Sequence, residues 1–280
     1  MNREQVLVQE QALAQDPEPE QDTAMVANSQ SEIRTRVEQG TITWTGPLLV
    51  VVGRSALMFV AQGIVAAVLA LQGNRTAWLS AGAWWTIYGT LIDLGCLILM
   101  WWFVRREGIT LRNLIGPIRW RYGRDIFVGI GLFLLVFPLF VGGGVLSGLA
   151  FYGTLQVTAY PGILGGRVLP VWAVIYSLSL WWMIWSPTEE MTYQGYVLPR
   201  IHALSGRAWI AVLVVSFWWS LQHSFLPFIP DLRFVLWRFL AFLPGVIAFT
   251  LVYLRTRRLA PLILAHWLMD ISAAVMTIQR

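Results

Sequence analysis

The sequence contains no lysine, a single cysteine and few charged residues of any kind. All twenty basic residues of the 280 are arginine, which we interpret as a compositional bias without functional meaning. The one cysteine, Cys96, lies in an apolar run, and this excludes an intrachain disulfide and a cysteine-based zinc motif. Charged residues make up 12% of the chain and hydrophobic residues 57%, a balance that excludes an ordinary soluble domain.

The hydrophobic residues gather in long runs after residue 40. A helix that crosses a bilayer needs about 20 consecutive apolar residues. We therefore predict an all-α polytopic membrane protein with about seven transmembrane helices. The runs cover residues 48–71, 83–104, 126–152, 170–198, 208–223, 235–254 and 260–278.

Residues 1–40 differ in composition from the rest of the chain. They hold eight of the fifteen acidic residues and the segment DPEPEQD, and they contain no apolar run long enough for a span or a signal peptide. Such a composition predicts a disordered cytoplasmic tail. Residues 41–280 would then form the transmembrane domain, in which no internal repeat is evident.

The arginines predict how the chain sits in the cell membrane. Positively charged short loops stay in the cytoplasm, and the second loop, residues 105–124, carries six arginines. Alternation from this loop predicts a cytoplasmic N-terminus and an external C-terminus. Because the arginines lie between apolar runs and not on one face, we expect the lipid bilayer as a partner and no nucleic acid. The other arginines expected on the cytoplasmic side are Arg34, Arg36, Arg200, Arg207, Arg255, Arg257 and Arg258, and those expected outside are Arg75, Arg167 and Arg233.

Four acidic residues lie within the apolar runs: Asp93, Glu189, Glu190 and Asp270. Insertion of a charged side chain at the centre of a membrane helix costs about 2.5 to 3.5 kcal/mol, so such residues usually face a partner or a wet cavity. We interpret Asp93 as a structural acid that pairs helices, because no histidine is near it in sequence. The other three are candidates for a functional site.

Helix arithmetic places these acids close to two histidines. The fourth and fifth runs form a hairpin whose tip lies near residues 205–206, about 16 residues after Glu189 and Glu190 and 17 before His223. At about 1.5 Å per residue these side chains lie at one height. His266 follows the Arg257–Arg258 turn by eight or nine residues, which predicts about the same layer, and Asp270 is one helical turn further along the same face.

The glutamate pair also has a structural interpretation. Ser186, Pro187, Thr188 and Glu189 spell a capping box with proline at the first helical position. This alternative requires a helix to begin near the middle of the membrane and leaves Glu190 unexplained. Pro187 can instead kink a continuous helix.

Three short motifs in a fixed order resemble the CAAX-protease and bacteriocin-processing family of intramembrane peptidases. They are EEMTYQ at 189–194, WSLQH at 219–223 and HWLMD at 266–270, and the resemblance covers a peptidase-like core at about 165–280. It implies an all-helical fold and a site that is sunk in the membrane and open to the cytosol.

The resemblance also implies the chemistry of an endopeptidase. Glu189, helped by His223, would activate water with support from Glu190, and His266 with the residue at 270 would stabilise the oxyanion. The substrate would be a peptide or a membrane protein, prenylated or of the leader type.

The sequence departs from the family pattern at three positions: Gln194 replaces an arginine, Trp219 replaces a phenylalanine, and Asp270 occupies the last position. Without the arginine, we predict that one glutamate carries a proton or that a bound cation takes its place. Arg200 is too far away, about 15 Å further along the helix. An ionised Asp270 is only an acceptor, so its expected role is to fix the tautomer of His266.

A metal cofactor and two other functions are left open by the sequence. One glutamate and two histidines are a plausible set for a divalent metal such as zinc, as in a metalloprotease, but there is no HExxH spacing. A proton-linked transporter or channel would also bury such residues, although it would more often show internal symmetry. A non-catalytic membrane partner or immunity protein of the same fold is the third alternative, and Gln194 in place of the family arginine leaves it open.

Overall fold

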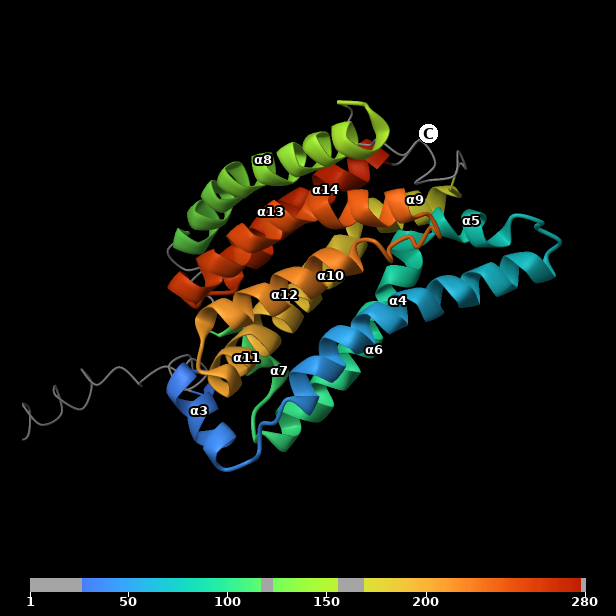
Figure 1. Ribbon diagram of the computed structural model, residues 1–280. Helices are drawn as coiled ribbons and strands as arrows, with labels where there is room; N and C mark the ends of the chain where they lie inside the picture. Colours follow the sequence, from blue (N-terminus) through green and yellow to red (C-terminus); the bar gives the residue numbers. More distant parts are fainter. Residues whose placement is uncertain (1–26, 117–122, 156–168, 278–280) are drawn as a thin grey trace, which may run out of the picture.

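The computed structural model describes residues 27–116, 123–155 and 169–277, and it confirms an all-α polytopic membrane protein. Apolar runs become helices in a membrane because a helix satisfies its backbone hydrogen bonds within the segment. The helices are α3 (Gln30–Glu38), α4 (Thr45–Leu71), α5 (Ala77–Gly82), α6 (Trp85–Arg106), α7 (Leu111–Ile115), α8 (Arg124–Tyr152), α9 (Val171–Ser179), α10 (Trp181–Glu190), the π-helix η2 (Met191–Val197), α11 (Leu198–Ser205), α12 (Ala208–Gln222), α13 (Leu232–Thr256) and α14 (Ala260–Thr277) (Figure 1).

Each of the seven predicted apolar runs is helical over most of its length. Helices α4, α6, α8 and α13 are long and apolar enough to cross a membrane by length and composition, whereas α12 and α14 are shorter apolar helices. The fourth run is divided into α9, α10, η2 and α11. This run holds the glutamate pair, which lies where α10 passes into the π-helix.

The helices surround a central group that carries the motifs. Helices α10, α12, α13 and α14 lie between α8 on one side and the pair α4 and α6 on the other (Figure 1). Helix α8 packs on α13 and α14, α10 packs on α6 and α14, and α4 contacts both α6 and α12. Helices α4 and α6 therefore cover one side of this central group, and α8 covers the other.

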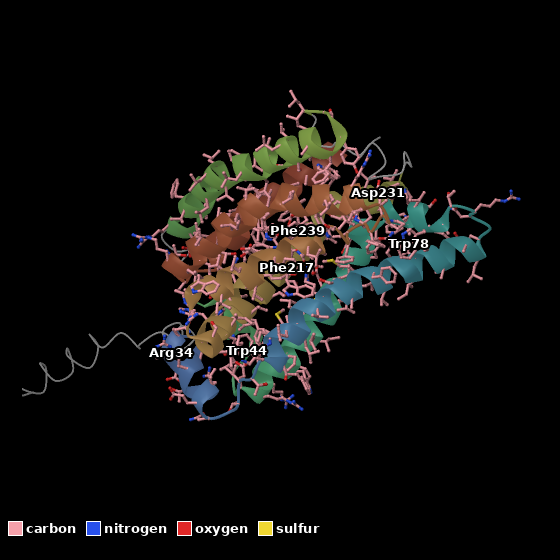
Figure 2. The ribbon with its side chains drawn as sticks, in the orientation of Figure 1. Arg34, Trp44, Trp78, Phe217, Asp231 and Phe239 are labelled. Atoms are coloured by element: carbon pink, nitrogen blue, oxygen red, sulfur yellow. The ribbon has the colours of Figure 1, made fainter. Side chains whose placement is uncertain are left out.

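The two ends of the molecule differ. Helices α3, α7 and α11 lie at one end, with Arg34 and Trp44, and α5 lies at the other, with Trp78 and Asp231 (Figures 1 and 2). Of the arginines used to predict topology, Arg119, Arg121 and Arg167 lie outside the described residues.

The prediction of a disordered tail is wrong for its last part. Residues 30–38 form α3, which starts at the N-cap Ser29, packs on α11 and buries Ile33 completely. Polar contacts fasten this segment, since the Asn28 side-chain amide donates to the Gly195 carbonyl at 3.0 Å. The many charged residues of the tail gave no indication that residues 30–38 pack on α11. Residues 1–26 lie outside the described residues.

Close packing of α8 on α13 depends on glycine. A Cβ atom at Gly143 would lie 2.3 Å from the backbone oxygen of Ala241, whereas one at Gly142 would meet nothing within 4 Å. We expect Gly143→Ala to lower the free energy of unfolding by about 1 to 3 kcal/mol, the usual cost of overpacking. Gly142→Ala is the matched control, and unfolding in detergent micelles measures both. Equal free energies of unfolding for the two variants would show that α8 and α13 can move apart to accept the methyl group without loss of stability.

Candidate functional site

The glutamate pair lies at the end of α10 and is completely buried. Glu189 and Glu190 are the last two residues of this helix, and neither side chain is exposed. The π-helix that follows is wider than an α-helix, and such segments are frequent at functional sites. All seven of its residues are buried.

Helix α10 continues through Pro187, so the capping-box interpretation is wrong. The Ser186 hydroxyl donates to Oδ2 of Asp270 on α14 and does not cap a helix. The Thr188 hydroxyl donates to the Ile184 carbonyl at 2.7 Å. Ser186 thus joins α10 to α14 beside the glutamates.

Glu189 is held by three hydrogen-bond donors from two other helices. Its Oε2 accepts from the indole nitrogen of Trp219 at 2.8 Å. Its Oε1 accepts from Nε2 of Gln222 at 2.6 Å and from Nη2 of Arg54 at 3.2 Å. These contacts fix the position of the carboxylate within the bundle.

Arg54 supplies the positive charge that Gln194 lacks. Its side chain comes from α4 and is completely buried. Besides Glu189, it donates to Oδ1 of Asp93 at 3.0 Å and to Oε1 of Gln222 at 2.8 Å. From the sequence we expected either a protonated glutamate or a bound cation at this place. The structure has a different arrangement, in which a guanidinium of the chain itself bridges the buried carboxylates of Asp93 and Glu189.

The two polar residues considered for this role have other partners. Gln194, in the π-helix, donates to the Thr250 hydroxyl on α13 at 3.2 Å. Arg200 is buried at the end that carries α3, where its guanidinium pairs with Glu107 and donates to the Tyr196 carbonyl. This position agrees with the estimate from helix rise, by which Arg200 is too far away to act as a counter-charge for the glutamates.

His266 joins the glutamate pair to Asp270. Its Nδ1 lies 3.0 Å from Oε1 of Glu190, within hydrogen-bond distance. Its Nε2 lies 3.7 Å from Oε2 of Glu189 and 3.7 Å from Oδ1 of Asp270. The closest partner of the ring is therefore Glu190, and not Asp270 as we expected from the sequence.

His223 is directed away from the glutamates. It follows the last residue of α12, and its ring stacks on Phe242 with 3.6 Å between centroids. Successive residues of a helix point about 100° apart, and it is Gln222 that faces Glu189. The predicted height is consistent with this arrangement, but the predicted contact is absent among the described residues.

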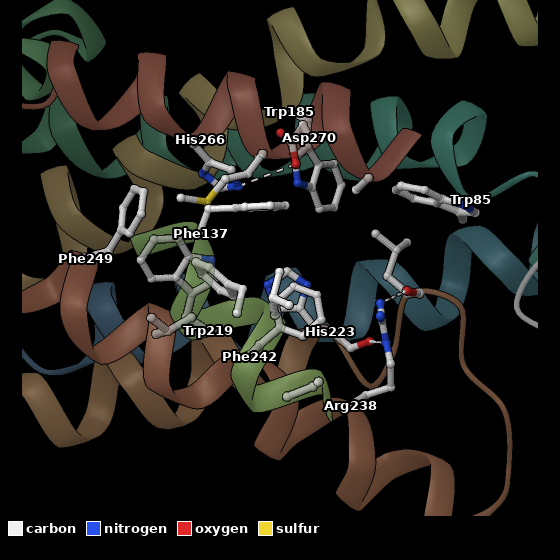
Figure 3. Close-up of a pocket in the computed structure, with 18 of the residues that line it drawn as sticks. Trp85, Phe137, Trp185, Trp219, His223, Arg238, Phe242, Phe249, His266 and Asp270 are labelled. Carbon is white, nitrogen blue, oxygen red and sulfur yellow. Dashed lines mark hydrogen bonds and ion pairs between the residues drawn. The ribbon is translucent and has the colours of Figure 1, made fainter. Parts of the chain in front are cut away.

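A cavity of about 230 Å³ adjoins this cluster (Figure 3). His266 and Asp270 form part of its wall, and His223 with Arg238 forms another part. Most of the remaining lining is aromatic: Trp85, Phe137, Phe140, Trp181, Trp185, Trp219, Trp237, Phe242 and Phe249. Glu189 and Glu190 are fully buried behind this wall.

The sequence left a metal open, with one glutamate and two histidines as a plausible set, and the described residues do not assemble this set. Within residues 27–116, 123–155 and 169–277, no group of three or more His, Cys, Asp or Glu side chains is arranged to hold a metal ion. Of the residues in that plausible set, Glu189 accepts hydrogen bonds from three donors and His223 is stacked on Phe242. We therefore derive no step through a metal.

Sequence reasoning missed three residues of this cluster, Arg54, Gln222 and Ser186, and set Asp93 aside as structural. A signal for Arg54 was present, because an arginine within an apolar run is as costly as an acid. Helix position alone gave no signal for Gln222 or Ser186. Their roles depend on which side of α12 and of α10 faces the cluster, and the sequence does not show this.

The comparison with known families identifies the C-terminal part of the chain. Residues 170–272 match the family described as Type II CAAX prenyl endopeptidase Rce1-like. This match confirms the family that the three motifs resemble. No curated protein and no solved structure matches the chain. Arg54 and Asp93 lie outside the matched residues.

Proposed function

We propose, on the premise that residues 170–272 are a type II CAAX prenyl endopeptidase domain, that this membrane protein is an intramembrane endopeptidase. It would hydrolyse peptide bonds of membrane-associated substrates, prenylated or of the leader type. One observation carries the proposal. Two helices distant in sequence bring Glu189, Glu190 and Asp270 within 3.0 to 3.7 Å of the His266 ring, and His266 and Asp270 lie in the wall of a cavity.

In the proposed mechanism, His266 is the base that activates water. Glu190 accepts a hydrogen bond from Nδ1, which leaves a lone pair on Nε2. A water molecule at Nε2 loses its proton to the ring as its oxygen attacks the substrate carbonyl. Glu189 and Asp270, each 3.7 Å from Nε2, stabilise the imidazolium that forms. The proton then passes to the leaving amine.

Glu189 acts in this scheme through its charge and position. The resemblance gives this residue the role of base, but its oxygens already accept three hydrogen bonds. We therefore assign it to positioning His266. On the other wall of the cavity, the ring nitrogens of His223 make no hydrogen bond to a described residue, and we assign this ring as a donor to the oxyanion.

The arginines support a cytoplasmic N-terminus. Helix α3 with Arg34 and Arg36 and helix α7 with Arg112 lie at one end of the bundle (Figure 1). Positive charge stays on the cytoplasmic side. The proposed orientation puts this end in the cytoplasm and the α5 end outside.

The experiment that tests the proposal compares membrane proteomes of cells with wild-type protein and with Glu189→Gln. We expect at least one protein fragment that appears only with the wild type, because the variant lacks the charge that stabilises the imidazolium. Glu38→Gln, at an exposed position of α3, is the matched control and should behave as the wild type.

Other outcomes of the same comparison favour the alternative functions. Unchanged biological activity of Glu189→Gln, without any fragment, favours a non-catalytic membrane partner. Loss of ion flux without proteolysis favours a proton-linked transporter. Either outcome contradicts the endopeptidase.

A further inference from the structure

The π-helix beside the glutamate pair is bound by a side chain from the other end of the sequence. Asn28 lies 167 residues before Gly195, and its Nδ2 donates to the Gly195 carbonyl at 3.0 Å. Its Oδ1 accepts from Nη1 of Arg200 at 3.3 Å, and the same nitrogen donates to the Tyr196 carbonyl at 3.1 Å. Asn28 is only 8% exposed. Asn28 and Arg200 together therefore bind the carbonyls of two consecutive residues of η2, away from water.

The Gly195 carbonyl needs this donor because its helical partner is missing. In an α-helix, this carbonyl would accept a hydrogen bond from the backbone N–H of residue 199. Residue 199 is a proline, which has no N–H, and the ring of a proline pushes away the carbonyl four residues before it. Asn28 supplies the donor that Pro199 lacks. The wide turn of η2 is thus stabilised by a residue outside the helix.

The π-helix also sets the direction of the side chains around the glutamates. Tyr193 donates to Oε1 of Gln222 at 2.8 Å, and Gln222 donates to Glu189 at 2.6 Å. Gln194 donates to the Thr250 hydroxyl at 3.2 Å. Conversion of η2 into an α-helix would shift one flank by one residue relative to the other, a rotation of about 100°. Such a rotation would break these contacts.

Helix α3 keeps Asn28 at the π-helix. It packs on α11 and buries Ile33 completely (Figure 1). The Arg36 guanidinium donates to the Ala27 carbonyl at 2.8 Å and so joins the two ends of the segment. We name residues 27–38 the tail latch. Because its main contact is with α11, the tail latch can detach while the membrane helices stay together.

We propose that Asn28 is a positioning residue of the active site, and that the docked tail latch holds the π-helix in the conformation in which Glu189 and Glu190 are correctly placed. Detachment of the tail latch would inactivate the enzyme. This inference rests on the proposed endopeptidase function. It adds to the site a segment that lies outside the matched residues 170–272, at the end of the bundle that we propose to be cytoplasmic.

The test compares the full-length wild type with Asn28→Ala in lipid nanodiscs. Amide hydrogen exchange should become faster in fragments that contain residues 191–200 and stay unchanged in α8 and α13. We expect kcat to fall by about tenfold, the size of one buried hydrogen bond. KM should change little, because neither η2 nor the tail latch contributes a described residue to the cavity wall.

Two further variants of the tail latch control this comparison. Thr35→Ala, at an exposed position of α3, should behave as the wild type in exchange and in kcat. Ile33→Ser should reproduce both effects of Asn28→Ala, because a hydroxyl at this fully buried position weakens the packing of α3 on α11.

A double variant separates positioning from stability. In Asn28→Ala with Pro199→Ala, the backbone N–H of residue 199 is available to the Gly195 carbonyl, and the segment can become an α-helix. We expect the slow hydrogen exchange of residues 191–200 to return while kcat stays low, because the rotation of the helix is then wrong. A purely structural role of Asn28 would restore both.

Three results would overturn this inference: unchanged exchange of residues 191–200 in Asn28→Ala, a wild-type kcat of this variant, or recovery of kcat in the double variant. Faster exchange in Asn28→Ala, in a protein that cleaves no substrate even as the wild type, would support the tail latch and contradict the endopeptidase. The two proposals therefore fail separately.

Discussion

Arg54→Met is expected to lower the free energy of unfolding by about 3 to 5 kcal/mol, the cost of removing one partner from a buried ion pair. The reason is that Asp93 and Glu189 would both remain buried without the cation that bridges them. Gln222 would also lose a donor to its side-chain oxygen. Denaturant titration in detergent micelles measures the change, and cleavage should fall with it because Glu189 loses its position.

Neutralising the two acids is the control for this prediction. In Arg54→Met combined with Asp93→Asn and Glu189→Gln, no carboxylate remains opposite the missing cation, and we expect most of the lost stability to return. Arg54→Lys should restore little, because an ammonium cannot reproduce the three directed contacts of the guanidinium. A single Arg54→Met variant as stable as the wild type would rule out a structural role for the bridge.

His266→Ala is expected to reduce the rate of cleavage by about 10² to 10⁴, the usual contribution of a positioned general base. The ring is the only described imidazole in contact with both glutamates and Asp270. The rate of fragment formation by purified protein in lipid vesicles measures the effect. The His266→Ala variant should still insert and fold, because the ring lies at the edge of a cavity.

His202→Ala is the matched control for this variant. His202 lies in α11, near the hairpin tip, and takes no part in the cluster. It should cleave at the wild-type rate. A rate of His266→Ala within tenfold of the wild type would remove His266 from the mechanism.

The helices and the height of the site could be predicted from the sequence. A long apolar run within a membrane forms a helix, because a helix satisfies the backbone hydrogen bonds within the segment. The equal distances of Glu189 and His223 from the hairpin tip predicted one layer, and the spacing of His266 and Asp270 predicted one helix face. The structure brings His266, Asp270 and both glutamates together in this layer.

The direction of side chains and the partners from distant helices could not be predicted. A count along a helix gives height, but the rotation of α12 decides whether Gln222 or His223 faces Glu189. The π-helix widens the turn that holds Gln194, so the spacing in the motif does not fix where this side chain points. Arg54 is 135 residues from Glu189 in sequence, and only the packing of α4 on the core brings them together.

The most direct test of the central claim follows the oxygen of water into the product. Purified protein in lipid vesicles is given a substrate found by the proteome comparison, in water enriched in oxygen-18. We predict that the new carboxylate of the fragment carries one oxygen-18 atom with the wild type, and that Glu189→Gln and His266→Ala form almost no fragment. Equal amounts of fragment from all three proteins would show that the Glu189, Glu190 and His266 cluster does not perform the hydrolysis.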